Sequence, residues 1–221
     1  MHLNEQGWIA TYQERQALWI YDSTRHTHHA ELTSGKHSDM FFNSRLIIAD
    51  DGLLAQATSD LLDLFTQQGG DLSNVEGAVG PQTGAKRMSE LMAPQIGYGT
   101  WHASPAKRGT SEQKEMVFTD QEIVRIQGKT LVCEDVVTTA GSVELTARAI
   151  TRAGGEVLPW ILCLVNRSGQ SEINGRKIVA LITRDANIWD PTNCPACAEG
   201  SIVVRQPKDN WPQLNAVKGA M

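Results

Sequence analysis

The sequence predicts an α/β fold in which a mostly parallel, twisted sheet is flanked by helices. Short apolar runs alternate with helix-length segments between residues 51 and 183, which is typical of parallel sheets covered on both faces. Glycines stand at the junctions between these segments, as at Gly69-Gly70 and Gly154-Gly155. The 221 residues, 41% of them hydrophobic, suit one such domain with additions.

Periodicity places the individual elements along the chain. The clearest helix is expected where Leu54, Leu61 and Phe65 recur at the helical spacing, and Gly69 ends it. Helices are expected over 4–20, 51–68, about 84–93 and 142–154. Strands are expected over 75–80, 96–101, 130–135, 157–167 and 177–183. The long polar stretch 102–118 is expected to be a binding loop or lid, and the segment after Asp190 is assigned no regular core role.

The charge balance excludes some classes of partner. The formal net charge is −5 and no dense block of lysine and arginine is present, which argues against nucleic acid and anionic membranes. No apolar run reaches the roughly 18 residues of a membrane span, and the N-terminal stretch has no apolar signal core. We therefore expect a cytoplasmic protein.

The stretch TLVCEDVVTTAGSV, residues 130–143, carries the strongest chemical signal. A strand that runs into a loop of small and hydroxyl residues and then into a helix is typical of a phosphate-binding site. No Walker loop and no G-x-G-x-x-G fingerprint is present. Because a carboxylate would repel a phosphate, Glu134 and Asp135 should face something else, and sugar hydroxyls are good candidates. Together these residues predict a site for a sugar phosphate.

This stretch resembles the motif that binds phosphoribosyl pyrophosphate (PRPP) in type I phosphoribosyltransferases. The resemblance implies that the loop holds the 5-phosphate and that Glu134 and Asp135, as catalytic residues, engage the ribose hydroxyls. It also implies that Asp135 stabilises developing positive charge. Ala140 departs from the glycine that is usual there. The implied 5-phosphate residues are Thr138, Thr139, Ala140, Gly141 and Ser142.

Three further segments resemble orotate phosphoribosyltransferases within that family. SGKHSDMFFNSRL (34–46) is similar to the hood over the base, which implies base contacts for Phe41 and Phe42. LVNRSGQ (164–170) implies that Arg167 pairs with the orotate carboxylate, as a bidentate guanidinium can. VGPQTGAKRM (79–88) is similar to the pyrophosphate loop. Matching segments run in the family's order from about residue 31 to 170.

The polar stretch departs most from the family, whose pattern is Arg-Lys-x-x-Lys-x-His-Gly. This chain reads WHASPAKRGT there, so a single lysine, Lys107, is available as the catalytic cation. The departure bears on orotate turnover more than on PRPP binding. The residues implied for pyrophosphate are Gln82, Thr83, Gly84, Lys86, His102 and Arg108.

The resemblance implies the remaining features. Residues 1–50 would form an N-terminal helix and hood, 51–190 the phosphoribosyltransferase core and 191–221 an irregular tail. Mg²⁺ would be held largely by the substrate, with Asp135 as the one candidate protein ligand. The protein would transfer ribose 5-phosphate from PRPP to orotate or a similar pyrimidine base and release pyrophosphate, as a homodimer whose mobile loop reaches the partner's site.

Other interpretations stay open. A phosphoribosyltransferase for another base would explain the altered loop, a PRPP-binding regulator shares the motif, and a non-enzymatic module is the last alternative. Cys133 and Cys163 lie in apolar runs and are expected to be buried thiols. Cys194 and Cys197 have the spacing of half a zinc knuckle but no second cysteine pair nearby in sequence, which favours a loop with two thiols over structural zinc.

Overall fold

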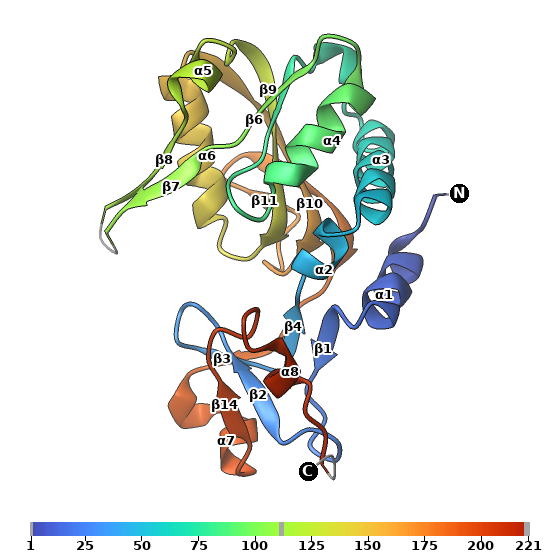
Figure 1. Ribbon diagram of the computed structural model, residues 1–221, viewed down its shortest axis with the longest axis vertical. Coiled ribbons are helices and arrows are strands. Elements are labelled where there is room, and N and C mark those ends of the chain that lie inside the picture. The colour runs from blue at the N-terminus through green and yellow to red at the C-terminus, as the bar shows by residue number, and fades with distance from the viewer. Residues whose placement is uncertain (1, 111–112, 219–221) are drawn as a thin grey trace.

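The structure is a computed structural model that describes residues 2–110 and 113–218. It has a larger lobe around a central sheet and a smaller lobe in which residues 18–42 pack with the segment after residue 187 (Figure 1). None of the helices in these described ranges combines the length and the apolar character that a bilayer span requires.

The larger lobe is built on a six-stranded sheet with the order β11-β12-β10-β9-β5-β6. Every neighbouring pair is parallel except β11 with β12, which confirms the predicted mostly parallel sheet. The carboxyl ends of the parallel strands therefore share one edge of the sheet, where ligands bind in such folds. The strands are β5 (Gly77–Val79), β6 (Trp101–Ala103), β9 (Gly128–Val137), β10 (Gly155–Asn166), β11 (Glu172–Ile173) and β12 (Arg176–Thr183).

Helices cover both faces of this sheet, because alternate residues of its strands are apolar on each side. On one face, α3 (Asp51–Gln67) and α4 (Lys86–Ile96) pack with α1 (Glu5–Glu14) against residues such as Leu131 and Leu162. On the other face, α6 (Gly141–Arg152) packs against Val132 and Ile161. The short elements α2 (Arg45–Ile48), η1 (Leu72–Asn74) and α5 (Asp120–Ile123) connect these layers.

The smaller lobe combines residues from the two ends of the chain around Trp19, Ala30 and Leu214. One ladder pairs β1 with β4, and a four-stranded sheet has the order β13-β3-β2-β14. Short helices α7 (Pro195–Ala198) and α8 (Trp211–Leu214) and the turn η2 (Pro191–Asn193) complete it. The strands are β1 (Leu18–Ile20), β2 (His28–Glu31), β3 (His37–Ser38), β4 (Met40–Phe42), β13 (Ile188–Trp189) and β14 (Ile202–Val204).

Three predicted elements are corrected by the structure. The helix expected over 4–20 ends at Glu14, and Leu18–Ile20 form strand β1 because they pair with β4. The strand expected over 96–101 begins only at Trp101, since α4 continues to Ile96. The polar stretch 102–118 begins in β6 and then forms a hairpin of β7 (Ala106–Gly109) and β8 (Lys114–Val117). Residues 111 and 112 lie outside the described ranges.

The segment after Asp190 is also more ordered than expected. Strand β14 pairs in parallel with β2, and Cys194, Val204 and Leu214 are buried. The prediction failed because β14 is short and pairs with a strand from the opposite end of the chain. The three-part division at residues 50 and 190 stays a prediction, although β2 and β14 share one sheet across it.

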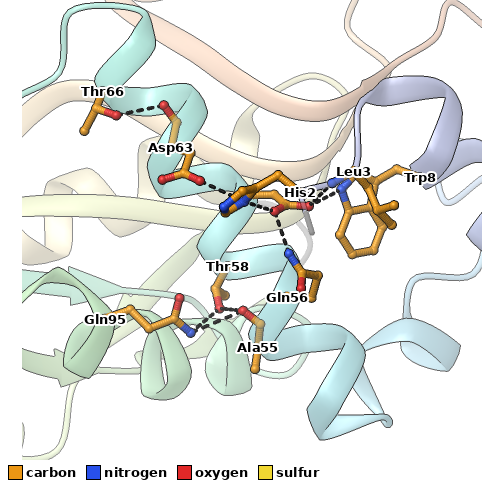
Figure 2. Close-up of polar contacts among 10 residues, drawn as sticks. His2, Leu3, Trp8, Ala55, Gln56, Thr58, Asp63, Thr66 and Gln95 are labelled. Atoms are coloured by element: carbon orange, nitrogen blue, oxygen red, sulfur yellow. Dashed lines mark hydrogen bonds and ion pairs between the residues drawn. The ribbon is translucent and has the colours of Figure 1, made fainter.

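A buried carboxylate ties the N-terminal segment to α3. Asp60 is only 2% exposed, and it accepts hydrogen bonds from the Leu3 amide (3.1 Å), the Trp8 indole (2.9 Å) and Gln56 (2.7 Å). The Nδ1 atom of His2 lies 2.7 Å from the same carboxylate. Figure 2 shows His2, Leu3 and Trp8 converging beside this helix. The carboxylate therefore fixes where α1 packs.

We predict that Asp60→Ala lowers the free energy of unfolding by about 2–4 kcal/mol, because the buried indole and amide donors lose their acceptor. Urea unfolding checks this. Asp63→Ala is the matched control, since Asp63 is on the same helix, contacts His2 and is half-exposed. A loss from Asp60→Ala no larger than that of the control would contradict the role assigned to Asp60.

Candidate active site

Two carboxylates end the buried part of β9, the central strand between β5 and β10. Glu134 and Asp135 are 7% and 8% exposed, at the sheet edge where the parallel strands end. Burial and the neighbouring Asp135 charge raise the pKa of Glu134 well above its usual value. One of the two carboxyls therefore tends to keep its proton in the free protein.

Asp135 is held more firmly than Glu134. Its carboxylate accepts from the Val136 amide (2.9 Å) and from Lys208 Nζ (3.2 Å). A Cβ atom at Gly84 would lie 2.6 Å from the Asp135 carboxyl carbon, so this close approach requires glycine. Asp135 thus lies between the end of β9, the loop after β5 and the C-terminal segment.

The loop after β9 forms one wall of a pocket of about 460 Å³. All five residues predicted for the 5-phosphate line it, together with Glu134. The loop leads into the first turn of α6, whose N-cap, Ala140, offers no side-chain hydrogen bond to the helix amides. These amides and the positive end of the helix therefore remain suited to an anion. Ala140 adopts φ 56°, the left-handed region in which the glycine usual at this position is unstrained.

Three cationic side chains line the same pocket: Lys107 from β7, Lys114 from β8 and Arg148 from α6. Lys107 was predicted from the sequence, whereas Lys114 and Arg148 were missed. Lys114 lies within the polar stretch that was identified as a binding loop, and Arg148 shares a face of α6 with Glu144 and Leu145, which also line the pocket. The predicted residues His102 and Arg108 are exposed and do not line this pocket.

The predicted pyrophosphate loop follows β5 and lies against the start of the hairpin. The Gln82 amide donates to the Pro105 carbonyl (2.9 Å), and its side chain donates to the Ser104 carbonyl (2.9 Å). Thr83 is exposed, and the peptide between Gln82 and Thr83 is cis. Lys86 begins α4 and lies 3.9 Å from Glu90, with half of its side chain exposed. Of these residues, Gly84 is the one in direct contact with an acid of β9.

Arg167 follows β10 and lies beside the end of β9, where its amide donates to the Val137 carbonyl (2.8 Å). The side chain is 8% exposed; its Nη2 donates to Ser38 (3.0 Å), and its Nε has no partner among the described residues. Burial lowers the pKa of Arg167, and the Asp39 charge opposes this. A desolvated guanidinium with an unsatisfied donor is suited to a carboxylate ligand.

The two predicted aromatic residues do not lie together. Phe42 packs edge-on against Tyr12 in the core of the larger lobe, and Phe41 packs against Trp211 in the smaller lobe. Neighbouring residues of a strand point to opposite faces, which separates the two rings. Strand β4 nevertheless follows directly after β3, whose Ser38 contacts Arg167.

Lys208 is the residue at this site that sequence reasoning missed most completely. Its ammonium group contacts Asp135 from a turn between β14 and α8. No sequence signal pointed to it, because the segment was interpreted as an irregular tail. Its position is set by the pairing of β14 with β2.

We predict that Glu134→Gln stabilises the free protein increasingly as the pH rises. The folded chain keeps a proton on Glu134 at pH values where the unfolded chain has lost it, so the wild-type free energy of unfolding falls between the usual and the raised pKa. Urea unfolding at pH 5 and pH 8 checks this. The difference in free energy of unfolding between variant and wild type should be larger at pH 8 than at pH 5 by about 1 kcal/mol or more. The exposed Glu172→Gln is the control; an equal difference at both pH values for Glu134→Gln would contradict the buried-pair account.

Comparison with known proteins supplies a family. No protein-family model matches the chain. The orotate phosphoribosyltransferase of Desulforamulus reducens is 30% identical over 177 residues, which are 80% of this chain and 86% of that protein. The enzyme of the same name from Caldicellulosiruptor saccharolyticus is 26% identical over 92% of this chain and 96% of its own length.

The fold agrees with these relatives. The crystal structure of orotate phosphoribosyltransferase from Aeropyrum pernix superimposes with a TM-score of 0.59 over 79% of this chain and 92% of that chain, at 21% sequence identity. The fold of this chain is thus a known architecture. Because this chain is 30% identical to the Desulforamulus reducens enzyme and covers 86% of its length, it belongs to the orotate phosphoribosyltransferase family.

Proposed function

We propose that this protein transfers ribose 5-phosphate from PRPP to orotate, with release of pyrophosphate, in pyrimidine nucleotide synthesis. The observation that carries the proposal is the pocket at the end of β9. There a loop of amides and hydroxyls, the buried Glu134 and the lysines Lys107 and Lys114 line one space, and the buried Asp135 is the next residue of the strand. The names of the relatives support orotate as the base. A cytoplasmic location, predicted from the sequence, is part of this proposal.

The 5-phosphate would bind in the loop before α6. Thr138, Thr139 and Ser142 offer hydroxyl donors, and Ala140 and Gly141 offer amides at the helix N-terminus. Lys107 from β7 and Arg148 from α6 add positive charge to the same pocket. A phosphate held here leaves the ribose ring beside Glu134 and Asp135.

The two acids would hold the ribose hydroxyls and stabilise the transition state. The bond between the ribose anomeric carbon and the pyrophosphate oxygen breaks, and its electron pair leaves with pyrophosphate. A ring nitrogen of the base forms the new bond to the same carbon, and the proton that this nitrogen carried is released to solvent. Positive charge develops on the ribose in between, and Asp135 offers a nearby negative charge in a site sheltered from water.

The leaving pyrophosphate needs cations and donors. Gln82, Thr83 and Gly84 present a loop beside Asp135, and Lys86 begins the helix that follows. Lys208 already neutralises Asp135 and can turn toward an anionic group. We propose that residues 102–118 act as a lid that moves when substrate binds. His102 and Arg108 keep their predicted role in pyrophosphate binding only if the hairpin moves in this way.

Mg²⁺ is suited to this donor set because carboxylate oxygens are the ligands that hard cations prefer. Asp135 is the protein side chain that would contact the ion, while ribose and pyrophosphate oxygens supply further ligands. When bound, the ion neutralises the pyrophosphate charge and makes it a better leaving group.

The base would bind beside Arg167. The unpaired Nε and the Nη2 that now contacts Ser38 form a fork that matches a planar carboxylate. The side chains of Phe41 and Phe42 point in opposite directions, so they would not stack together on the ring of the base. They would instead hold strand β4 in place.

We further propose a homodimer, as the family resemblance implies. The hairpin β7–β8 brings Lys107 and Lys114 to the pocket of its own chain, so a partner's loop would add to this site rather than supply its first cations. The molar mass in solution tests the dimer.

A panel assay tests the function. The protein is incubated with PRPP, Mg²⁺ and one base at a time, and pyrophosphate release is measured; Asp135→Asn serves as the blank. Turnover with orotate and none with other bases is the expected result. Turnover with a different base only would favour the alternative transferase. PRPP binding without turnover on any base would favour the regulatory protein.

We predict that Arg167→Lys raises the KM for orotate at least about tenfold, because an ammonium group cannot make the bidentate pair. The KM for PRPP should stay within about twofold, since Arg167 does not line the phosphate pocket. Steady-state kinetics check both values. Arg184→Lys is the matched control, because Arg184 follows the adjacent strand and forms a half-exposed pair with Glu5. An unchanged KM for orotate would exclude this role for Arg167.

A further inference from the structure

Four side chains from distant parts of the chain converge in the smaller lobe. They are His29 in β2, His37 in β3, Cys194 directly before α7, and Cys197 within it. One nitrogen or sulfur atom from each lies within 4.8 Å of the other three. The His29 Nε2 atom is 3.0 Å from His37 Nδ1, 3.6 Å from Cys194 Sγ and 3.4 Å from Cys197 Sγ. Cys197 Sγ is 3.3 Å from His37 Nδ1.

These distances match the edges of a tetrahedron around a zinc ion. Zinc bonds of about 2.0–2.1 Å to nitrogen and about 2.3 Å to sulfur place neighbouring donor atoms roughly 3.3–3.8 Å apart. Four of the six separations between the donor atoms run from 3.0 to 3.6 Å; three of them lie within the range for zinc, and the distance between the two histidines, 3.0 Å, is about 0.3 Å shorter. Two imidazoles and two thiols are also one of the common ligand sets of structural zinc.

The surroundings prepare His29 as a ligand. Ser201 Oγ lies 3.0 Å from His29 Nδ1 and donates its own proton to the Thr27 carbonyl (3.2 Å). The serine oxygen therefore accepts from Nδ1–H, which leaves the Nε2 lone pair directed at the other three donors. His29 is fully buried.

We propose that His29, His37, Cys194 and Cys197 form a structural zinc site. All four coordination positions come from the protein, which is the arrangement of a closed structural site and leaves no position for substrate. Thiolate ligands select zinc over Mg²⁺, so this site is distinct from the pocket at the end of β9. All four cysteines of the chain are free thiols. Cys194 and Cys197 point at the histidines rather than forming a disulfide with each other.

The metal would join the two ends of the chain. It links the β2–β3 hairpin to α7, after which β14 returns along β2. Residue Ser38 follows His37 and contacts Arg167, while the chain beyond β14 carries Lys208 to Asp135. The zinc site therefore supports the position of two groups at the candidate active site, although the inference stands without the proposed function.

Metal analysis of the full chain tests this directly. The protein is produced without a histidine tag, purified without chelator and analysed by elemental mass spectrometry. We expect about one zinc per chain, falling below roughly 0.1 in Cys194→Ser/Cys197→Ser and in His37→Ala. His28→Ala and Cys163→Ala are matched controls that keep the metal, because His28 is next to His29 in β2 and is not among the four converging residues, and Cys163 lies in the central sheet.

A second measurement does not depend on the folding of variants. The wild-type protein, stripped of metal, is titrated with Co²⁺, and the absorption bands of tetrahedral cobalt with thiolate ligands should appear and saturate at one equivalent. A strong chelator should lower the melting temperature of the wild type by roughly 5 °C or more, and excess Mg²⁺ should not restore it. A wild-type protein that holds no zinc and takes none up, or an intact Cys194–Cys197 disulfide, would overturn the proposal.

Discussion

The direction in which β9 ends is the constraint on which this structure depends. The strand has parallel neighbours on both sides and helices on both faces, so the residues that follow it can leave the sheet at one edge only. Two acids end its buried part, and a helix begins a few residues later without a side-chain cap. The same backbone turn thereby places desolvated negative charge beside unpaired amides. A ligand with a phosphate at one end and hydroxyls at the other satisfies both.

The smaller lobe completes this edge from outside the sheet. Ser38 contacts Arg167 and Lys208 contacts Asp135, so the smaller lobe supplies partners for two buried charged groups of the larger lobe. Leaving either charge alone would be costly, because buried ions need compensating partners. The relative position of the lobes is therefore part of the electrostatics of the site as well as of its shape.

The sequence predicted the parts of the site that are local in the chain. The strand, acids and loop of 130–143 are contiguous, so hydrophobic pattern and turn chemistry were enough to find Glu134, Asp135 and Thr138. Arg167 was identified through the resemblance of residues 164–170 to orotate phosphoribosyltransferases, at the end of a strand that the apolar run predicted. The helix over 51–68 was confirmed almost to the residue for the same reason.

The parts that failed depend on contacts between distant segments. Residues 18–20 resemble the continuation of a helix until β4 pairs with them, and β14 is too short to be recognised without β2. Lys208 and the group formed by His29, His37, Cys194 and Cys197 are defined by that pairing. The cysteines have the spacing of half a zinc knuckle but were interpreted as a loop with two thiols, because the two histidines lie more than a hundred residues upstream without a motif of their own.

The parallel pairing of β14 with β2 also sets the order of events during synthesis. The larger lobe contains every strand of its sheet once residue 183 has left the ribosome, and its contacts are mostly between successive segments. Strand β2, made near the beginning, must wait for residues 202–204 before it gains its last neighbour. Because domains generally fold as they emerge, the nascent chain carries an open sheet edge at β2 until residues 202–204 have been made.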